Sequence, residues 1–412
     1  MIFGMTLTDY RNFEKVIEKI KKYREQREVI KQQKKSLRVF DYETQLSVFK
    51  ELYADIIQAE DFKTRETVTK TAEAYMKKKL SNWGDYTDSI FRILRATGVV
   101  VFSKGRTLTL SSERSSEIKY ILENIDREIV SVDMKREDFD LYISNPYKPL
   151  LLNDDKDNLI NTLRSIGSFG NNDEDIYVLK HRLNQQRNLK KQEKVESESL
   201  KLKKRYQADI DDILQTFEAI SNREIEPASM RPTFFEWNIW RAMTMINHGD
   251  VRGNFVVDDS GMPVSTAGGG QSDIVGDYGE FNIGIEVTLS TGQKQFEMEG
   301  EPVSRHIGEM QVKKPTFGLF IADVLNESVI NYFYTLSHQK SKIYNGTVDI
   351  IPMNTTTFIE FFKQATNKDI NPKDLFSIHE HSIQVSKQML IEDKTEDDWY
   401  KSVIKKVFTV VE

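Results

Sequence analysis

Acidic residues and a histidine concentrate in one part of the chain, between positions 232 and 310. Asp273 and Glu286 stand thirteen positions apart, and Glu299 and His306 follow at a spacing of seven. Hydrolysis of a phosphodiester needs a hydroxide, stabilisation of the negative charge on phosphorus and a proton for the leaving oxygen. A Mg²⁺ ion held by two or three carboxylates and several waters supports all three requirements. These residue types therefore indicate a candidate site for metal-dependent hydrolysis.

One further acid, Glu236, lies within the sequence FFEWNIWRAMTMI. Apolar residues occur nearly all round this predicted helix, so we expect it to be buried, and Pro232 opens it at a position where proline is well tolerated. A glutamate on such a helix needs a partner, because a buried charge without one is costly. A metal ion or an arginine would serve, and the sequence leaves that choice open.

A hairpin is predicted to carry the central pair of acids. Residues 281–289 alternate between apolar and polar side chains, which places Glu286 and Thr288 on the polar face of a strand. A shorter strand at 274–275, joined to it through a turn at 277–279, would bring Asp273 close to Glu286. The pattern also fits an ordinary half-exposed hairpin whose acids face water.

The sequence that follows the hairpin, QKQFEMEGEPVSRHIGEM, predicts a helix that breaks at Gly300 and a second helix that Pro302 opens. This segment presents Glu299 and His306. A histidine near several acids can relay a proton, although a lone histidine is more often structural. Strands and helices then alternate over 316–365, which is typical of an α/β layer.

Three strings of this segment resemble the catalytic segment of the PD-(D/E)xK nuclease superfamily: FFEWNIW, GGGQSDIV and GIEVTLSTGQKQFEMEGEPVSRH. More closely, they are similar to the type IIS restriction and strand-nicking endonucleases of the AlwI family. The similarity is dense over 233–306 and diffuse elsewhere, and the combined string that ends in EPVSRH is its most specific part. The resemblance implies a C-terminal α/β restriction-endonuclease-like domain with a central mixed sheet, which cuts DNA with Mg²⁺.

The resemblance also implies roles for individual residues. The implied metal ligands are Glu236, Asp273 and Glu286. The implied catalytic residues are Asp273, Glu286, Glu299 and His306. It further implies a recognition segment before Met1, so we expect the chain to open inside its recognition module.

Two positions depart from the superfamily motif. Ser272 stands where the motif has proline, and Thr288 stands where it usually has lysine. A threonine supplies no positive charge to orient water or to stabilise the reacting phosphate. A second metal ion, Lys294 or His306 must then take over that role.

The front of the chain is predicted to be helical. We expect helices over 9–33, 42–58 and 65–80, and a last helix that Asp85 caps and that ends near Gly98. Strands at 99–102 and 107–110 would then form a hairpin. Helices followed by a basic-tipped hairpin occur in this order in a winged helix-turn-helix module, whose last helix enters the DNA major groove. The same fold also serves as a protein–protein adaptor.

Four basic residues of this front end would reach DNA. Arg92 and Arg95 lie on the last predicted helix, and Lys104 and Arg106 lie on the hairpin. The net charge of the chain is -6, but it divides into +7 over 1–120, -4 over 121–220 and -9 over 221–412. This asymmetry favours a DNA-docking module joined to a cation-binding module, although chance clustering on solvated helix faces gives the same pattern.

Composition excludes several classes of protein. With 412 residues, 39% of them hydrophobic, the chain is long and apolar enough to form more than one folded domain. It has no cysteine, which excludes disulfides, thiolate zinc sites and cysteine nucleophiles, so any metal must bind oxygen or imidazole. Neither a membrane-length apolar run nor a signal-peptide pattern occurs, and we therefore expect a cytoplasmic location. The family resemblance implies that this is the bacterial cytoplasm.

We expect three domains: a winged-helix DNA-recognition domain at 1–125, a helical linker at 126–222 and a PD-(D/E)xK-like nuclease domain at 223–412. The predicted function is a Mg²⁺-dependent endonuclease that cuts double-stranded DNA outside the recognised sequence, one strand per active site. A double-strand break then needs a second nuclease subunit or a transient dimer. The alternative is a winged-helix DNA-binding regulator with an inactive nuclease-like domain.

Overall fold

The structure is a computed structural model, and it describes residues 13–33, 37–63, 68–103, 107–126, 134–145, 148–225, 228–246, 249–266 and 269–412. Contacts divide the chain into two compact units, one formed by 1–97 with 218–231 and the other by 98–217 with 232–412. The three-domain division stays a prediction. Within the described ranges, no helix combines the length and the apolar character that a membrane crossing requires.

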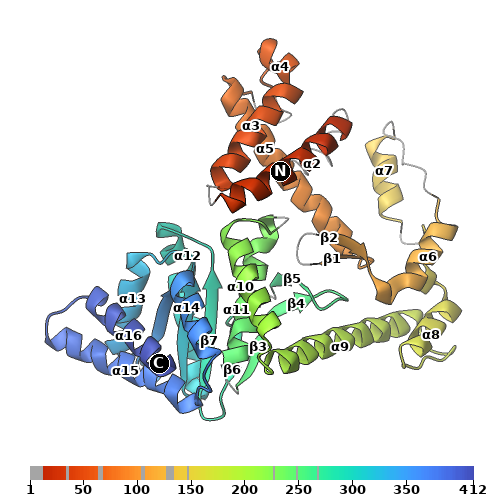
Figure 1. Ribbon diagram of the computed structural model, residues 1–412. Helices are drawn as coiled ribbons and strands as arrows, with labels where there is room; N and C mark the ends of the chain where they lie inside the picture. The colour runs from red at the N-terminus through yellow and green to blue at the C-terminus, as the bar shows by residue number, and fades with distance from the viewer. Residues whose placement is uncertain are drawn as a thin grey trace. The chain divides into compact units, whose positions relative to one another are not determined.

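Helices form the described part of the first unit (Figure 1). They are α2 (Phe13–Gln32), α3 (Leu37–Leu52), α4 (Ala54–Gln58), α5 (Ala72–Ala96) and the 3-10 turn η4 (Ala228–Met230). Its core consists of Val48, Phe49, Tyr53, Tyr75, Met76 and Leu80. The Phe49 and Tyr53 rings stack with centroids 4.9 Å apart, and Tyr75 meets Phe49 edge-on at 6.1 Å. The end of α3, Tyr53 directly after it and one face of α5 therefore supply the apolar surfaces that join these helices.

One continuous helix, α5, replaces the two helices that the sequence predicted at 65–80 and from Asp85, and that prediction was wrong. Its N-cap is Thr71, whose hydroxyl accepts a hydrogen bond from the Ala74 N–H at 3.2 Å. Asp85 lies inside the helix. A glycine such as Gly84 costs a helix only about 1 kcal/mol relative to alanine, which is too little to end a capped helix that packs on one side.

The second unit begins with the predicted hairpin, in which β1 (Val100–Ser103) pairs antiparallel with β2 (Thr107–Leu110). A series of helices follows: η2 (Ser112–Arg114), α6 (Ser115–Asn124), α7 (Arg136–Ile143), η3 (Leu152–Asp154), α8 (Lys156–Ser165), α9 (Ile176–Leu202) and α10 (Gln207–Ser221). Because contacts place the hairpin in this unit and the preceding helices in the first, the winged-helix arrangement is not confirmed.

A five-stranded mixed sheet lies at the centre of the second unit. This confirms the central mixed sheet that the family resemblance implied. Its order is β3 (Asp250–Gly253), β6 (Ile274–Asp277), β7 (Asn282–Thr288), β8 (Thr316–Ala322) and β9 (Ile350–Asn354). The first three strands pair antiparallel, and β7, β8 and β9 pair in parallel. A separate hairpin joins β4 (Phe255–Val257) to β5 (Pro263–Thr266). Every residue of β8 is buried, as expected for a parallel strand covered on both faces.

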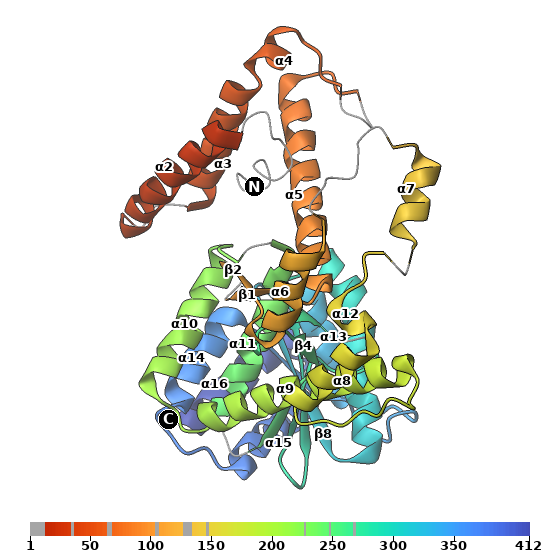
Figure 2. The same cartoon turned by 90° about the vertical axis from the view of Figure 1, so that its right-hand side faces the viewer.

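The remaining helices of this unit are α11 (Arg231–Ile246), α12 (Gln293–Lys313), α13 (Glu327–His338), α14 (Thr355–Ala365), α15 (Pro372–Ile391) and α16 (Glu396–Val411). Aromatic contacts join them to one another and to the sheet. Phe217 of α10 meets Phe235 of α11 and Phe358 of α14, with ring centroids 6.3 and 6.1 Å apart, and Figure 2 shows these helices as neighbours. Phe333 of α13 meets Phe320 of β8 at 5.4 Å.

Helix α12 is continuous, whereas the sequence predicted a break at Gly300 and a new helix from Pro302; that prediction was wrong. A proline inside a helix removes one backbone hydrogen bond and crowds the preceding turn. Helix α12 buries one face, including Val303 and Ile307, and contacts β7 and β8. Packing on the sheet thus holds the helix together across the proline.

Candidate active site

The hairpin of β6 and β7 brings Asp273 and Glu286 together. Ile274 pairs with Ile285, so the two acids lie level on adjacent strands. Asp273 Oδ2 accepts a hydrogen bond from the Val287 N–H at 2.8 Å. Glu286 is 6% exposed, because both faces of β7 are covered; the alternative of a half-exposed hairpin is therefore wrong.

Glu236 projects from α11 into the same region. Its side chain is buried, and its Oε2 atom has no hydrogen-bond partner among the described residues. Burial, followed by the charges of Asp273, Glu286 and Glu299, raises the pKa of Glu236 to about 9. Burial and the charge of Glu286 likewise raise the pKa of Asp273 to about 8. These acids are close enough to repel one another, as the residues of a shared cation site would.

Helix α12 contributes His306 and Glu299. His306 Nδ1 is 2.9 Å from Glu286 Oε1, and His306 Nε2 is buried without a partner among the described residues. The hydrogen bond to Glu286 raises the pKa of His306. Burial raises the pKa of Glu299, against a hydrogen bond that the Thr288 hydroxyl donates to Glu299 Oε1 at 2.8 Å. We call these residues the carboxylate site: Glu236, Asp273, Glu286, Glu299 and His306.

Two glycines allow α12 to approach the sheet. Gly284 of β7 and Gly318 of β8 are register neighbours. A Cβ atom on Gly284 would lie 2.4 Å from Ile307 Cδ1, and one on Gly318 would lie 3.0 Å from Ile307 Cγ1. Ile307 directly follows His306, so the space that the two glycines leave open helps to place His306 beside Glu286.

Thr288, at the position where the superfamily usually has lysine, has a structural contact that the sequence did not predict. Its hydroxyl donates to Glu299 and accepts from the Ser290 N–H at 3.0 Å, so both its hydrogen-bonding functions are used. Lys294, on the first turn of α12, is exposed. The eleven-residue spacing between Thr288 and Glu299, from a strand into the next helix, carried no signal that the two would meet.

The carboxylate site fits a divalent cation in its donor chemistry. Carboxylate oxygens are the ligands that Mg²⁺ prefers, and Glu236 Oε2 is a buried oxygen to which no described residue donates a hydrogen bond. Within the described ranges, no three acidic or histidine side chains are already close enough together to hold an ion. Negative charges on Glu236, Asp273 and Glu286 repel one another, and a bound cation would offset this repulsion and allow the carboxylates to come closer together.

The candidate DNA-binding residues differ in their surroundings. Arg92 is exposed on α5, with 68% of its side chain accessible, and pairs with Asp88 at 3.0 Å. Arg95 is half-buried, and its Nη1 donates to Met230 Sδ at 2.7 Å. Lys104 and Arg106 lie outside the described residues. DNA contact by these four residues stays a prediction.

A second group of basic residues was missed by the sequence analysis, which treated α9 only as part of a linker. Arg187, Lys190, Lys191 and Lys194 are spaced as i, i+3, i+4 and i+7, which places them on one face of α9. They line a pocket in the second unit. Their helical spacing was the signal that could have revealed it.

A family model described as AlwI restriction endonuclease matches residues 1–361. The chain belongs to the AlwI restriction endonuclease family. This confirms the resemblance seen in the three sequence strings. Membership of the AlwI family supports a DNA endonuclease, and restriction endonucleases generally use divalent metal ions.

Among solved structures, the chain is similar to the small subunit (R.BspD6I2) of the heterodimeric restriction endonuclease R.BspD6I. The two share 25% sequence identity, with a TM-score of 0.39, and the similarity covers 48% of this AlwI family member and 98% of that subunit. No curated protein matches the chain.

Proposed function

We propose that this AlwI family member is a Mg²⁺-dependent endonuclease of the type IIS or nicking kind, which hydrolyses double-stranded DNA outside the sequence that it recognises. The observation that carries the proposal is the carboxylate site, where three acids, on α11, on β7 and just before β6, raise one another's charge repulsion. Glu236, buried with an unpartnered oxygen, is the clearest member. One such site per chain accounts for one strand cut at a time.

The proposed metal ligands are Glu236, Asp273 and Glu286. A bound Mg²⁺ supplies an acidified water and stabilises negative charge on the phosphate. The Val287 N–H orients Asp273, and the Thr288 hydroxyl orients Glu299.

His306 has a different part in the proposal. In the neutral tautomer whose Nδ1–H donates to Glu286, Nε2 keeps its lone pair, so that Nε2 can take up a proton from water and return it to the leaving oxygen.

The proposal extends to partners and location. Binding of double-stranded DNA is assigned to the basic front end, with Arg92 and Arg95 reading bases and Lys104 and Arg106 contacting the backbone. Cutting both strands would need a second nuclease subunit or a transient dimer. The proposed location is the bacterial cytoplasm.

Arg92 offers a direct test of base reading. Arg92→Ala should cost roughly 1–3 kcal/mol of discrimination between the target and random duplexes if this side chain reads a base edge. Lys203→Ala, an exposed change at the end of α9, is the control. Equal losses on all duplexes would show that Arg92 does not read sequence.

The decisive experiment incubates the protein with supercoiled plasmid, with and without Mg²⁺. We expect conversion to open circles with Mg²⁺ and none with a chelator, while gel shifts still detect binding. Conversion to linear plasmid would indicate cutting of both strands. Binding without any conversion, whichever divalent metal is supplied, would refute the proposal and identify a DNA-binding regulator.

A further inference from the structure

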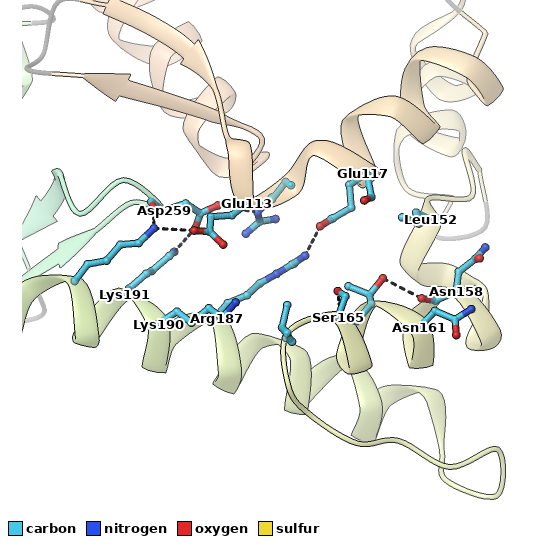
Figure 3. A pocket seen from close by; sticks show the side chains of 15 residues that line it. Glu113, Glu117, Leu152, Asn158, Asn161, Ser165, Arg187, Lys190, Lys191 and Asp259 are labelled. Atoms are coloured by element: carbon cyan, nitrogen blue, oxygen red, sulfur yellow. Dashed lines mark hydrogen bonds and ion pairs between the residues drawn. The ribbon is translucent and has the colours of Figure 1, made fainter.

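A pocket of about 250 Å³ lies between α9 and the segments around α6 and α8 in the second unit. Figure 3 shows Arg187 and Lys191 extending from α9 across the pocket, toward Glu117 and Asp259 respectively. All its lining residues belong to the same compact unit. We call it the α9 pocket.

Each acid of the α9 pocket has a cationic partner. Glu117 pairs with Arg187, and Glu113 pairs with Lys194 at 3.0 Å. Asp259 is 3.2 Å from Arg114 Nε and 3.6 Å from Lys191 Nζ. The lining holds five basic residues, Arg114, Arg187, Lys190, Lys191 and Lys194, against these three acids. Two positive charges are therefore in surplus.

Lys190 is the clearest source of this surplus. It lines the pocket half-buried, and its ammonium group makes no ion pair or hydrogen bond with any described residue. Arg187 gives a second indication: burial lowers its pKa, and the nearby charge of Arg114 lowers it further, against the opposing effect of Glu117. A pocket whose cations repel one another favours an anion.

Helix α8 adds neutral polar groups to the α9 pocket. Asn158 and Asn161 line it one helical turn apart, with Thr162 and Ser165 beside them. No described residue is bonded to the side-chain amide of Asn161. Amide N–H groups beside lysine and arginine are donors that suit phosphate oxygens. At about 250 Å³ the pocket falls below the usual range for larger organic ligands, so a single phosphate group is the better fit.

We propose that the α9 pocket binds a backbone phosphate of the DNA that the enzyme cuts, at a point far along the chain from the basic front end. The choice of DNA as the source of the phosphate rests on the proposed nuclease function, whereas the anion chemistry rests on the pocket alone. The second unit then holds DNA through its own contact and does not depend entirely on the front end for affinity.

Binding of a random-sequence duplex by the full-length protein tests the proposal. The assay is run in chelator, so that its outcome does not depend on whether the protein cuts, and the salt concentration is varied. Lys190→Gln should weaken binding several-fold and reduce the slope of log affinity against log salt by about 0.9, the value for one lost phosphate contact. Asn161→Asp, which adds a negative charge to the pocket, should weaken binding at least as much. Lys203→Gln, an exposed change at the end of α9, is the control.

A second arm measures the melting temperature with inorganic phosphate, chloride being used to keep ionic strength constant. Phosphate should stabilise the wild type and the Lys203→Gln variant more than Lys190→Gln. If Lys190→Gln and Asn161→Asp match the control in both arms, the α9 pocket is not a phosphate site. If they lose only the response to inorganic phosphate, the pocket takes a free anion and the assignment to DNA is overturned. Normal plasmid cutting alongside either result would leave the nuclease proposal intact.

Discussion

The carboxylate site and the α9 pocket both contain acids withdrawn from water, but their surroundings shift the pKa values of Glu236 and Asp259 in opposite directions. In the α9 pocket, burial favours the neutral form of Asp259, but a hydrogen bond from Ser111 and the charges of Arg114 and Lys191 outweigh it and lower the pKa of Asp259. In the carboxylate site, burial and neighbouring acids raise the pKa of Glu236 to about 9. A buried acid is therefore no sign of chemistry by itself. An acid left among other acids, without a cation, is the stronger indication of a ligand-binding site.

The largest expected effect comes from removing a central acid of the carboxylate site. Asp273→Ala should lower the rate of plasmid nicking by at least about 10²–10³-fold, because it removes a proposed metal ligand, while DNA affinity stays largely unchanged. Asp277→Asn is the control, since Asp277 lies on the same hairpin but pairs with Lys314 at 2.6 Å. Near-normal Mg²⁺-dependent nicking by the Asp273 variant would break the assignment.

A smaller effect is expected from the residue that orients Glu299. Thr288→Val keeps the shape of the side chain but removes its hydrogen bond to Glu299, and should lower nicking about 10–100-fold, the usual cost of losing a residue that orients a group at a metal site. Thr288→Ser should restore activity because it restores the hydroxyl. If valine and serine behave alike, the hydroxyl has no positioning role.

Stability in the absence of metal should expose the repulsion in the carboxylate site. The pKa of Glu236 rises on folding from an ordinary 4.5 to about 9, so its contribution to stability is fully present below pH 4.5 and is lost as the pH rises toward 9. Glu236→Gln should remove this loss and raise the free energy of unfolding at pH 8 in chelator by an amount on the order of a few kcal/mol, which a higher melting temperature reports. Glu309→Gln, an exposed change on α12, is the control. A lower melting temperature for Glu236→Gln would contradict the repulsion.

The α9 pocket should give the opposite pH dependence, with a smaller effect. Because the folded pKa of Asp259 is lowered, its contribution to stability is present above its ordinary value near 3.8 and is lost as the pH falls below it. Asp259→Asn should lower stability at pH 7 by about 1–3 kcal/mol, the usual cost of losing hydrogen bonds to a charged group. Urea unfolding at pH 7 and pH 3 measures the difference. An equal loss at both values would mean that the charge of Asp259 is unimportant.

Local patterns in the sequence were sufficient to predict the hairpin of the carboxylate site. Strict alternation over 281–289 and the turn at 277–279 set the register that places Asp273 beside Glu286. The same alternation could not reveal that the second face of β7 is also covered, because that depends on helices distant in the chain. The alternation of residues therefore could not predict that Glu286 is buried.

Breaks in helices were the features that local patterns predicted worst. Pro302 lowers the local preference for helix, but packing of Val303 and Ile307 on the sheet keeps α12 continuous.

The α9 pocket was not predicted from the sequence for a related reason, because it too depends on contacts between distant parts of the chain. The helical spacing of its basic residues is visible in the sequence, whereas their partner Asp259 comes from a loop more than sixty positions later.

The two glycines beneath α12 limit how the chain can vary. Gly284, Ile307 and Gly318 share one small volume, because a Cβ atom on either glycine would crowd Ile307. A larger residue at position 284 or 318 is compatible with the present depth of α12 only where position 307 carries a smaller side chain. These three positions should therefore change together during evolution, although none of them carries a polar side chain and none belongs to the proposed chemistry.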